Sequence, residues 1–340
     1  MKPACHPHPE SRSGAPKCRR ASLSLMAVSL VVLLARPAHA AEPLTSANAD
    51  LQAGRADAAI TKLNDALQAD PKSAEVYNLL CRVEYSLEKW NEAADHCEKA
   101  VNLDTRNAGY HLWLGRAIGE RASRASWTSA FSLAKRTREE FETAVKLDPK
   151  DGEALSDLGE FYTQAPGVVG GGTDKAEGIA KQLETIDPAR SHHLRGLIAE
   201  KQKDLATAEK EFKAATTTAH PAVSWMELAS FYRRHERWAD MESAVASGQA
   251  AAARDKHSAV ALFNGASILS RANRQIEEAI KLYEGYLAAP EKSEEAPAFE
   301  ALIHLAKLRK QTGDGAGAAR DRASALALAH DYKPAQEAKF

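Results

Sequence analysis

Residues whose types could support chemistry, such as the 4 cysteines and 12 histidines, are not spaced for it. The 4 cysteines form no CxxC pair, and no metal-ligand spacing occurs. The glycine-rich segment 166–172 (PGVVGGG) lacks the GK[ST] ending of a phosphate-binding loop, so we expect a tight turn before a helix capped by Thr173 or Asp174. We find no nucleophile–base pair and no cofactor fingerprint. The sequence therefore predicts no catalytic residue, no cofactor and no metal, and a protein that is not an enzyme.

A basic segment with two aromatic residues is better suited to binding than to catalysis. Trp127 and Phe131 are four residues apart and would share one face of a helix. The stretch from Arg116 to Arg138 carries six basic side chains and one acidic one, Glu120. Such a segment can lie on anionic lipid or on an acidic partner, or its aromatic rings can simply cover neighbouring helices.

Charge and composition exclude some classes of partner. A formal net charge of −1 and 6% aromatic residues argue against nucleic-acid binding by bulk electrostatics or base stacking. The hydrophobic content of 44% is normal for a folded protein and high for a disordered one. We therefore expect a folded protein that does not bind nucleic acid.

Residues 1–40 have the layout of a cleavable signal peptide. A basic start precedes the 15-residue, mostly apolar run 21–35, which is shorter than the ~20 residues of a spanning helix, and Ala38-His39-Ala40 fits the cleavage pattern. We expect cleavage after Ala40 and export to the periplasm or the cell exterior; an uncleaved anchor or an upstream-placed start codon is the alternative. Because the segment carries six basic residues and one acidic residue, its removal changes the net charge from −1 to −6. No other run is long enough to cross a bilayer, so the mature chain has no predicted membrane segment.

The strongest pattern in the remaining sequence is self-similarity. Four segments end an amphipathic pattern with Asp-Pro or Asp-Thr: 63–71 (LNDALQADP), 97–105 (CEKAVNLDT), 141–149 (FETAVKLDP) and 181–188 (KQLETIDP). Each Asp-Pro or Asp-Thr ending after an amphipathic pattern predicts the end of a helix. A helical pattern that recurs with a period of ~20–50 residues indicates stacked helical units.

The recurring offsets resemble the tetratricopeptide repeat (TPR), an antiparallel helix pair of about 34 residues. Small residues at fixed places let helix backbones approach, and large ones fill the layer between them. The matching residues include, in three of the units, Tyr77, Leu80, Cys81, Ala93, Cys97 and Ala100, then Trp225, Leu228, Ala229 and Tyr232, then Phe263, Ala266, Ala279 and Tyr283. The resemblance implies an all-α right-handed superhelix, an α-solenoid of about eight such hairpins.

The expected organisation is a signal peptide at 1–40, a superhelix at 41–334 and a tail at 335–340. The first and last units match the pattern less well, as expected of caps that face solvent on one side. Two units, 108–151 and 152–190, are longer than the family length, and their surplus lies near 122–134 and 165–172. Insertions in repeat proteins map to loops on one face and often contribute to binding.

The resemblance also implies where a partner binds. In this family, fixed places on the first helix of each repeat line an inner groove, and here these places supply Asn78, Arg82, Tyr85 and Arg116, with Trp113 beside them. Asn78, Arg82 and Arg116 match part of the set that holds a peptide carboxylate in some members, whereas Leu79 and Gly109 depart from it. The candidate partner-binding residues are therefore Asn78, Arg82, Tyr85, Trp113, Arg116, Trp127 and Phe131. We expect both arginines to be exposed, so that replacing them would leave the melting temperature nearly unchanged; an ordinary solvated face is the alternative to a groove.

Cys81 and Cys97 take inward places on the two helices of one repeat in this resemblance. Their separation is marginal for a disulfide, which needs Cα atoms within ~7 Å. A disulfide and two buried free thiols are both consistent with the sequence, and the free thiols are favoured slightly.

The sequence thus predicts a non-catalytic scaffold or adaptor of the cell envelope that binds a peptide segment of a partner protein, whose identity it does not specify. Two alternatives are a membrane-surface adaptor acting through the basic-aromatic insertion and a non-catalytic subunit of an envelope enzyme complex.

Overall fold

A computed structural model describes residues 38–339 of the chain. These residues form seventeen α-helices and two short 3₁₀ helices, and their β-structure is limited to one isolated bridge between Ser293 and Ala296. The predicted signal peptide lies outside the described residues except for positions 38–40. The prediction of an all-α repeat superhelix is confirmed.

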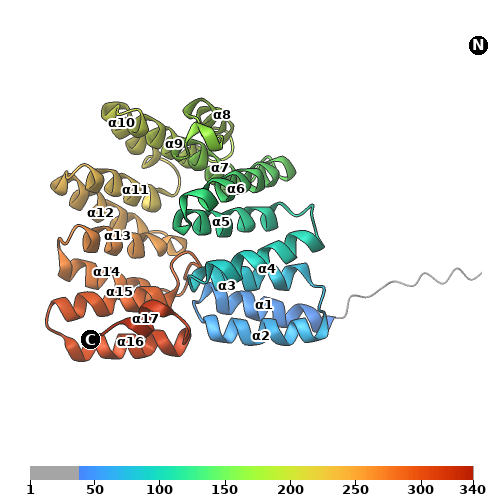
Figure 1. Ribbon diagram of the computed structural model, residues 1–340. Coiled ribbons are helices and arrows are strands. Elements are labelled where there is room, and N and C mark those ends of the chain that lie inside the picture. The colour runs from blue at the N-terminus through green and yellow to red at the C-terminus, as the bar shows by residue number, and fades with distance from the viewer. Residues whose placement is uncertain (1–37, 340) are drawn as a thin grey trace, which may run out of the picture. The chain divides into compact units, whose positions relative to one another are not determined.

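Sixteen of the helices pair into eight consecutive hairpins (Figure 1), and a short last helix follows them. The pairs are α1 (Ala38–Gln52) with α2 (Ala56–Ala69), α3 (Ala74–Ser86) with α4 (Trp90–Leu103), α5 (Ala108–Arg124) with α6 (Trp127–Leu147), α7 (Gly152–Gln164) with α8 (Thr173–Leu183), α9 (Pro188–Lys201) with α10 (Leu205–Ala215), α11 (Pro221–Arg234) with α12 (Trp238–Ala252), α13 (Val260–Arg271) with α14 (Ile276–Ala288), and α15 (Ala298–Gln311) with α16 (Gly315–Leu328), followed by α17 (Lys333–Glu337). The 3₁₀ helices are η1 (Gly167–Val169) and η2 (Lys256–Ser258). Residues 335–337 of the expected tail lie in α17.

Local side chains explain where the helices stop. Asp70, Asp104 and Asp148 each follow the last residue of a helix in an extended conformation. Their carboxylates accept hydrogen bonds from backbone amides two residues later, at 3.0, 3.0 and 3.1 Å. An aspartate that bonds its own following backbone favours a turn over a further helical turn. The repeated Asp-Pro and Asp-Thr endings are therefore hairpin-to-hairpin turns.

Alternation of small and large residues packs the helices together. Ala93 and Ala144 are fully buried in the second helices of their hairpins. A Cβ atom at Gly115 would lie 2.6 Å from the ring of Phe141, and one at Gly196 would lie 2.8 Å from that of Phe212. Each aromatic ring therefore fills the space that the missing side chain leaves on the facing helix.

The two period-breaking insertions differ in structure. The surplus near 122–134 is mostly helical: it extends α5 to Arg124 and starts α6 at Trp127, so it lengthens a hairpin rather than adding a loop. The surplus near 165–172 is a loop that contains η1 and turns at Gly170, whose φ is 98°. Helix α8 begins after Gly172 without a side-chain cap, so the predicted capping by Thr173 or Asp174 is wrong.

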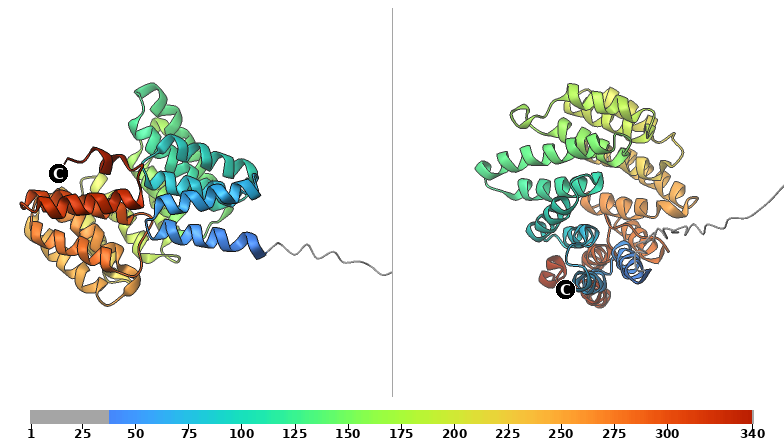
Figure 2. Two further views of the ribbon diagram at one scale, coloured as in Figure 1. Left: turned by 90° about the horizontal axis from the view of Figure 1, so that it is seen from below. Right: turned by 90° about the vertical axis from the view of Figure 1, so that its right-hand side faces the viewer.

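The first and last hairpins lie side by side within the compact unit Pro37–Phe340, as the two sets of views show (Figures 1 and 2). Leu51 and Leu79 share one buried cluster with Phe299, Ile303 and Tyr332. The expectation that the terminal repeats are solvent-facing caps is therefore wrong on these faces. Stacking rotates each repeat by a small angle, and here the accumulated rotation brings the two ends into contact.

Polar contacts accompany this closure of the superhelix. The backbone amide of His330 donates to Asp57 at 3.0 Å, and Lys89 lies 2.5 Å from Asp331. These residues are more than 200 positions apart, at sequence separations of 273 and 242. The contacts join α2 and the α3–α4 turn to the segment that follows α16.

Candidate partner-binding site

Five of the sequence-predicted residues come together on α3 and α5. Tyr85 and Trp113 meet edge to face with ring centroids 5.6 Å apart. The guanidinium carbons of Arg82 and Arg116 lie 5.3 and 4.8 Å from the centroid of Trp113. Asn78 precedes Arg82 by one helical turn on α3. We call Arg82, Tyr85, Trp113 and Arg116 the Arg–Trp cluster; its geometry is that of cation–π stacking on one indole.

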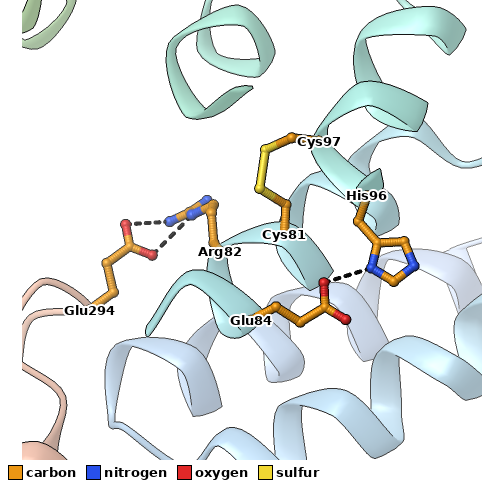
Figure 3. The surroundings of a disulfide bond; sticks show 6 residues. All are labelled: Cys81, Arg82, Glu84, His96, Cys97 and Glu294. Carbon is orange, nitrogen blue, oxygen red and sulfur yellow. Dashed lines mark hydrogen bonds and ion pairs between the residues drawn. A yellow bond between two sulfur atoms is a disulfide. The ribbon is translucent and has the colours of Figure 1, made fainter. Parts of the chain in front are cut away.

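The two arginines are not exposed, contrary to the sequence expectation. Their side chains retain 19% and 14% of their accessible surface. Arg82 donates from Nε and Nη2 to the two carboxylate oxygens of Glu294 at 2.9 and 2.8 Å (Figure 3). Glu294 lies in the segment 289–297 between α14 and α15, which we call the crossing loop. A solvated face is therefore the wrong description of this surface.

Arg116 is paired with a different set of carboxylates. Its Nε donates to Asp157 at 2.6 Å and its Nη2 to Glu153 at 3.3 Å, both on α7. Glu295 of the crossing loop lies farther off, at 4.0 Å from Nη1. Burial alone would lower the pKa of Arg116, but Asp157 raises it above its ordinary value, so this guanidinium stays charged.

A cavity of about 500 Å³ lies beside Arg82 of the Arg–Trp cluster, toward the N-terminal ends of α3 and α5. It is lined by the first helices of three hairpins, including Asn48, Glu75, Asn78, Arg82 and Tyr110. Within the described chain, Asn48 Oδ1 and Asn78 Nδ2 are buried without a hydrogen-bond partner. Buried polar groups are nearly always paired, so these two amide atoms, which belong to residues that line the cavity, are exceptions.

A second cavity, of about 580 Å³, lies on the other side of the cluster. Tyr85 and Arg116 line it together with Ala134, Pro166 and Val169, which come from or adjoin the two insertions. The insertions of the third and fourth hairpins thus wall the space beside the cluster. Burial raises the pKa of the Tyr85 hydroxyl, which remains protonated.

Trp127 and Phe131 are not part of this arrangement. They lie at the start of α6, where Trp127 keeps 86% of its accessible surface and Phe131 keeps 37%. Lys135 lies over the ring of Phe131 at 4.4 Å. Several basic residues around them are already paired: Arg124 with Glu120, Arg136 with Glu98, and Arg138 with Glu142.

Cys81 and Cys97 form a disulfide that joins α3 to α4 directly beside Arg82 (Figure 3). Their Cα atoms are 5.2 Å apart, well within bonding reach. The slight preference for two free thiols is therefore wrong. The helices of this hairpin approach closely because Ala93 and Ala100, on the same face of α4, are fully buried and small.

Sequence reasoning missed the residues that complete the site. Glu294 and Glu295 belong to a connection flanked by Pro290 and Pro297, and Asn48 belongs to the poorly matching first repeat. An unusually long, acidic connection between two hairpins is the one local signal that distinguishes the crossing loop. The pairing of this loop with Arg82 on α3 can be known only from the closure of the superhelix.

Residues 38–339 contain no group of three or more His, Cys, Asp or Glu side chains placed to hold a metal ion. None of their helices combines the length and apolarity needed to span a bilayer.

Comparison with known proteins gives matches to TPR proteins. A TPR protein of Thermus thermophilus is 21% identical over 56% of this chain and 98% of its own, with a TM-score of 0.46. A TPR protein of Parabacteroides merdae is 14% identical over 88% of this chain and 99% of its own, with a TM-score of 0.44. The structure of MamA is 25% identical over 47% of this chain and 86% of its own, with a TM-score of 0.37. No curated protein matches this chain.

One family model matches part of the sequence. Residues 50–117, which span the second half of the first hairpin, all of the second and the start of the third, match the tetratricopeptide repeat. This match includes Asn78, Arg82, Tyr85, Trp113 and Arg116. It supports the assignment of these hairpins to the tetratricopeptide-repeat type, a type whose members commonly mediate protein–protein interaction.

Proposed function

We propose that this protein is a non-catalytic interaction scaffold of the cell envelope that binds a peptide segment of a partner protein along α1, α3 and α5. The observation that carries the proposal is the Arg–Trp cluster with the Asn-lined cavity beside it. Aromatic and arginine side chains in partly desolvated positions contribute most of the binding energy in protein interfaces. Asparagine side chains that lack partners can bond the backbone of an incoming peptide.

The shape of the region favours an extended peptide over a globular surface. The two cavities, of about 500 and 580 Å³, flank the cluster on either side. A peptide strand that passes over Trp113 would meet Asn78 on one side and the walls formed by the insertions on the other. Backbone bonds would give affinity, and the arginines would select carboxylates.

Site-directed photo-crosslinking tests where the partner lies. A photoreactive residue replaces Glu75, which is exposed at the first cavity, or Ser123, which is exposed at the second. A matched control carries it at Leu205, an exposed apolar residue at the start of α10. We expect a shared crosslinked protein from positions 75 and 123 and none from 205. Crosslinks from 205 alone would contradict the proposed groove.

The envelope assignment rests on the signal-peptide pattern of residues 1–40. N-terminal sequencing of the exported form is expected to begin at Ala41. Recovery of an unprocessed protein from the cytosol would refute this part of the proposal.

A membrane-surface adaptor is the second candidate, and the exposure of Trp127 favours it. An indole that keeps 86% of its surface at the tip of a long hairpin can insert at a lipid interface. The internal ion pairs of Arg124, Arg136 and Arg138 reduce the charge available to anionic lipid. Sedimentation with anionic vesicles, compared between the wild type and Trp127→Ala, separates this candidate from the scaffold.

A further inference from the structure

The carboxylate of Glu294, in the crossing loop, pairs with Arg82, the arginine that the proposed groove offers to a partner. Arg82 and Glu294 are 212 residues apart in the sequence and form a two-pronged ion pair. Both side chains are mostly buried, at 19% and 15% of their accessible surface. Paired hydrogen bonds between a guanidinium and a carboxylate are among the stronger polar contacts in proteins.

The two arginines of the Arg–Trp cluster differ in how they depend on the crossing loop. Arg116 keeps Asp157 and Glu153 of α7 as partners whatever the loop does. Among the described residues, the carboxylate paired with Arg82 is that of Glu294. Removal of this carboxylate would leave a mostly buried guanidinium, stacked on Trp113, without an anionic partner. Arg82 is therefore the position where an anion is required.

The backbone of the crossing loop is held independently of Glu294. The hydroxyl of Tyr286 donates to the carbonyl of Ala296 at 2.5 Å and accepts from the amide of Ser293 at 3.0 Å. Ala296 and Pro297 are buried. An exchange of carboxylates on Arg82 consequently needs only the Glu294 side chain to rotate away, while the loop stays in place.

The cavity next to Arg82, of about 500 Å³, has room for the rest of an incoming segment, and two of the residues that line it hold unpaired amide atoms. Asn78, which lies one turn before Arg82 on α3, is 6% exposed, and its Nδ2 has no hydrogen-bond partner among the described residues. Asn48 Oδ1 on α1 is likewise buried and unpaired in that part of the chain. Both atoms are shielded from solvent, so each side chain has to rotate toward the cavity before this donor and acceptor can bond the carbonyl and amide of a peptide backbone.

We propose that Glu294 is a resident internal ligand of the groove, and that the partner segment is acidic and extended, with a carboxylate that replaces Glu294 on Arg82. This inference rests on the proposed function and names the class of partner that the groove takes. The tethered Glu294 competes at high effective concentration, so it lowers the apparent affinity for the partner. A partner segment without a carboxylate at this point would leave Arg82 unpaired and would bind poorly.

The test uses the loop's own sequence as the probe. A synthetic peptide of residues 288–298 (AAPEKSEEAPA) carries Glu294 and Glu295 in their natural context, and a matched peptide carries Gln at these two positions; both peptides keep Glu291. Fluorescence anisotropy measures the binding of each peptide to the wild type, to Glu294→Gln/Glu295→Gln, and to a control with the same change in another adjacent pair, Glu277→Gln/Glu278→Gln. Circular dichroism checks that each variant retains its helix content.

We expect the acidic peptide to bind Glu294→Gln/Glu295→Gln about tenfold or more tightly than it binds the wild type or the control, because the competing charged pair is lost. We expect the Gln peptide to bind all three weakly, and a further Arg82→Gln substitution to remove the gain. Equal binding of the acidic peptide to the wild type and the variant would overturn the inference, and so would equal binding of the acidic and Gln peptides. The single substitution Glu294→Gln gives the same discrimination if the double variant loses helix content.

The crosslinking experiment separates this inference from the proposed function. If the partner still crosslinks at position 75 but the acidic peptide binds no variant, the groove binds a partner of another chemistry and the internal-ligand inference is wrong. If no partner protein crosslinks to the photoreactive residue at position 75 or 123, and neither peptide binds, the proposed function and the inference are both wrong.

Discussion

Gly54 offers a sharp test of whether the first and last hairpins pack together. It lies in the α1–α2 turn with φ 69°, and a Cβ atom there would lie 2.4 Å from the backbone nitrogen of Ala298, the first residue of α15. That nitrogen belongs to the other end of the superhelix and cannot rotate away as a side chain would. Substitution by alanine should therefore push the two ends apart.

The backbone conformation of this turn is not itself the obstacle. Glu88, Lys203 and Glu236 hold the equivalent place in three other hairpins with φ of 60°, 65° and 57°. Gly313 holds it in the last hairpin with φ 93°, and a Cβ atom there would meet nothing within 4 Å. Gly313→Ala is thus a matched control that carries the left-handed strain without the clash.

The expected magnitudes differ between the two variants. A Cβ atom in the left-handed region costs about 1–2 kcal/mol, and this applies to both. Gly54→Ala adds an overpacking cost of about 1–3 kcal/mol, or the closure opens and its contacts are lost. Among these contacts are those of His330 with Asp57 and of Lys89 with Asp331.

Urea unfolding gives the free energies, and hydrogen exchange shows where protection is lost. We expect Gly54→Ala to raise exchange in α3 and α15, whereas Gly313→Ala leaves both helices protected. Equal destabilisation by the two substitutions, with unchanged exchange in α15, would refute the close approach of Gly54 and Ala298.

Three further predictions concern the packing, the disulfide and the pH dependence. Ala144→Leu should lower the free energy of unfolding by about 1–3 kcal/mol in denaturant melts, because Ala144 is fully buried between helices. Replacing both Cys81 and Cys97 by alanine should lower it by about 3 kcal/mol, from the entropy of the 16-residue link, and reducing agent should then no longer affect the melt. A hydrogen bond from Arg237 lowers the pKa of Glu209 from 4.5 to about 2, so the stability from this pair is complete above pH 4.5 and is lost as the pH falls toward 2. Glu209→Gln should flatten the acid side of the stability profile in that window, and an unchanged profile would contradict the assignment.

The fold could be predicted because its signals are local. Each hairpin is marked by buried alanines such as Ala93 and Ala144 at fixed offsets, and by aspartates such as Asp70 and Asp148 that end helices through their own backbone. Such signals act within one or two helical turns, so they can be recognised in a single sequence. The helical periodicity of α3 likewise suffices to place Asn78, Arg82 and Tyr85 on one face of that helix.

The candidate site could be predicted only in part, for a physical reason. The stacking of Arg82 and Arg116 on Trp113 joins adjacent repeats, and the repeat pattern constrains their geometry. The pairing of Arg82 with Glu294 depends instead on how far the six successive hairpins from α3–α4 to α13–α14 rotate, and each contributes a small angle that no local pattern records. The lengthened third hairpin and the loop in the fourth change that rotation in ways that their residue counts do not specify.

The sequence by itself determined the helix type, the hairpin repeat and the choice of residues on the inner face of α3 and α5. The tertiary structure decided that this face is closed by the crossing loop, that Cys81 reaches Cys97, and that Gly54 meets Ala298. Helix formation and nearest-neighbour packing are set by residues a few positions apart, whereas closure is set by the sum of all the packing angles and by contacts more than 200 residues apart, such as that of Arg82 with Glu294 at a separation of 212. Those contacts form only once every intervening repeat is in place.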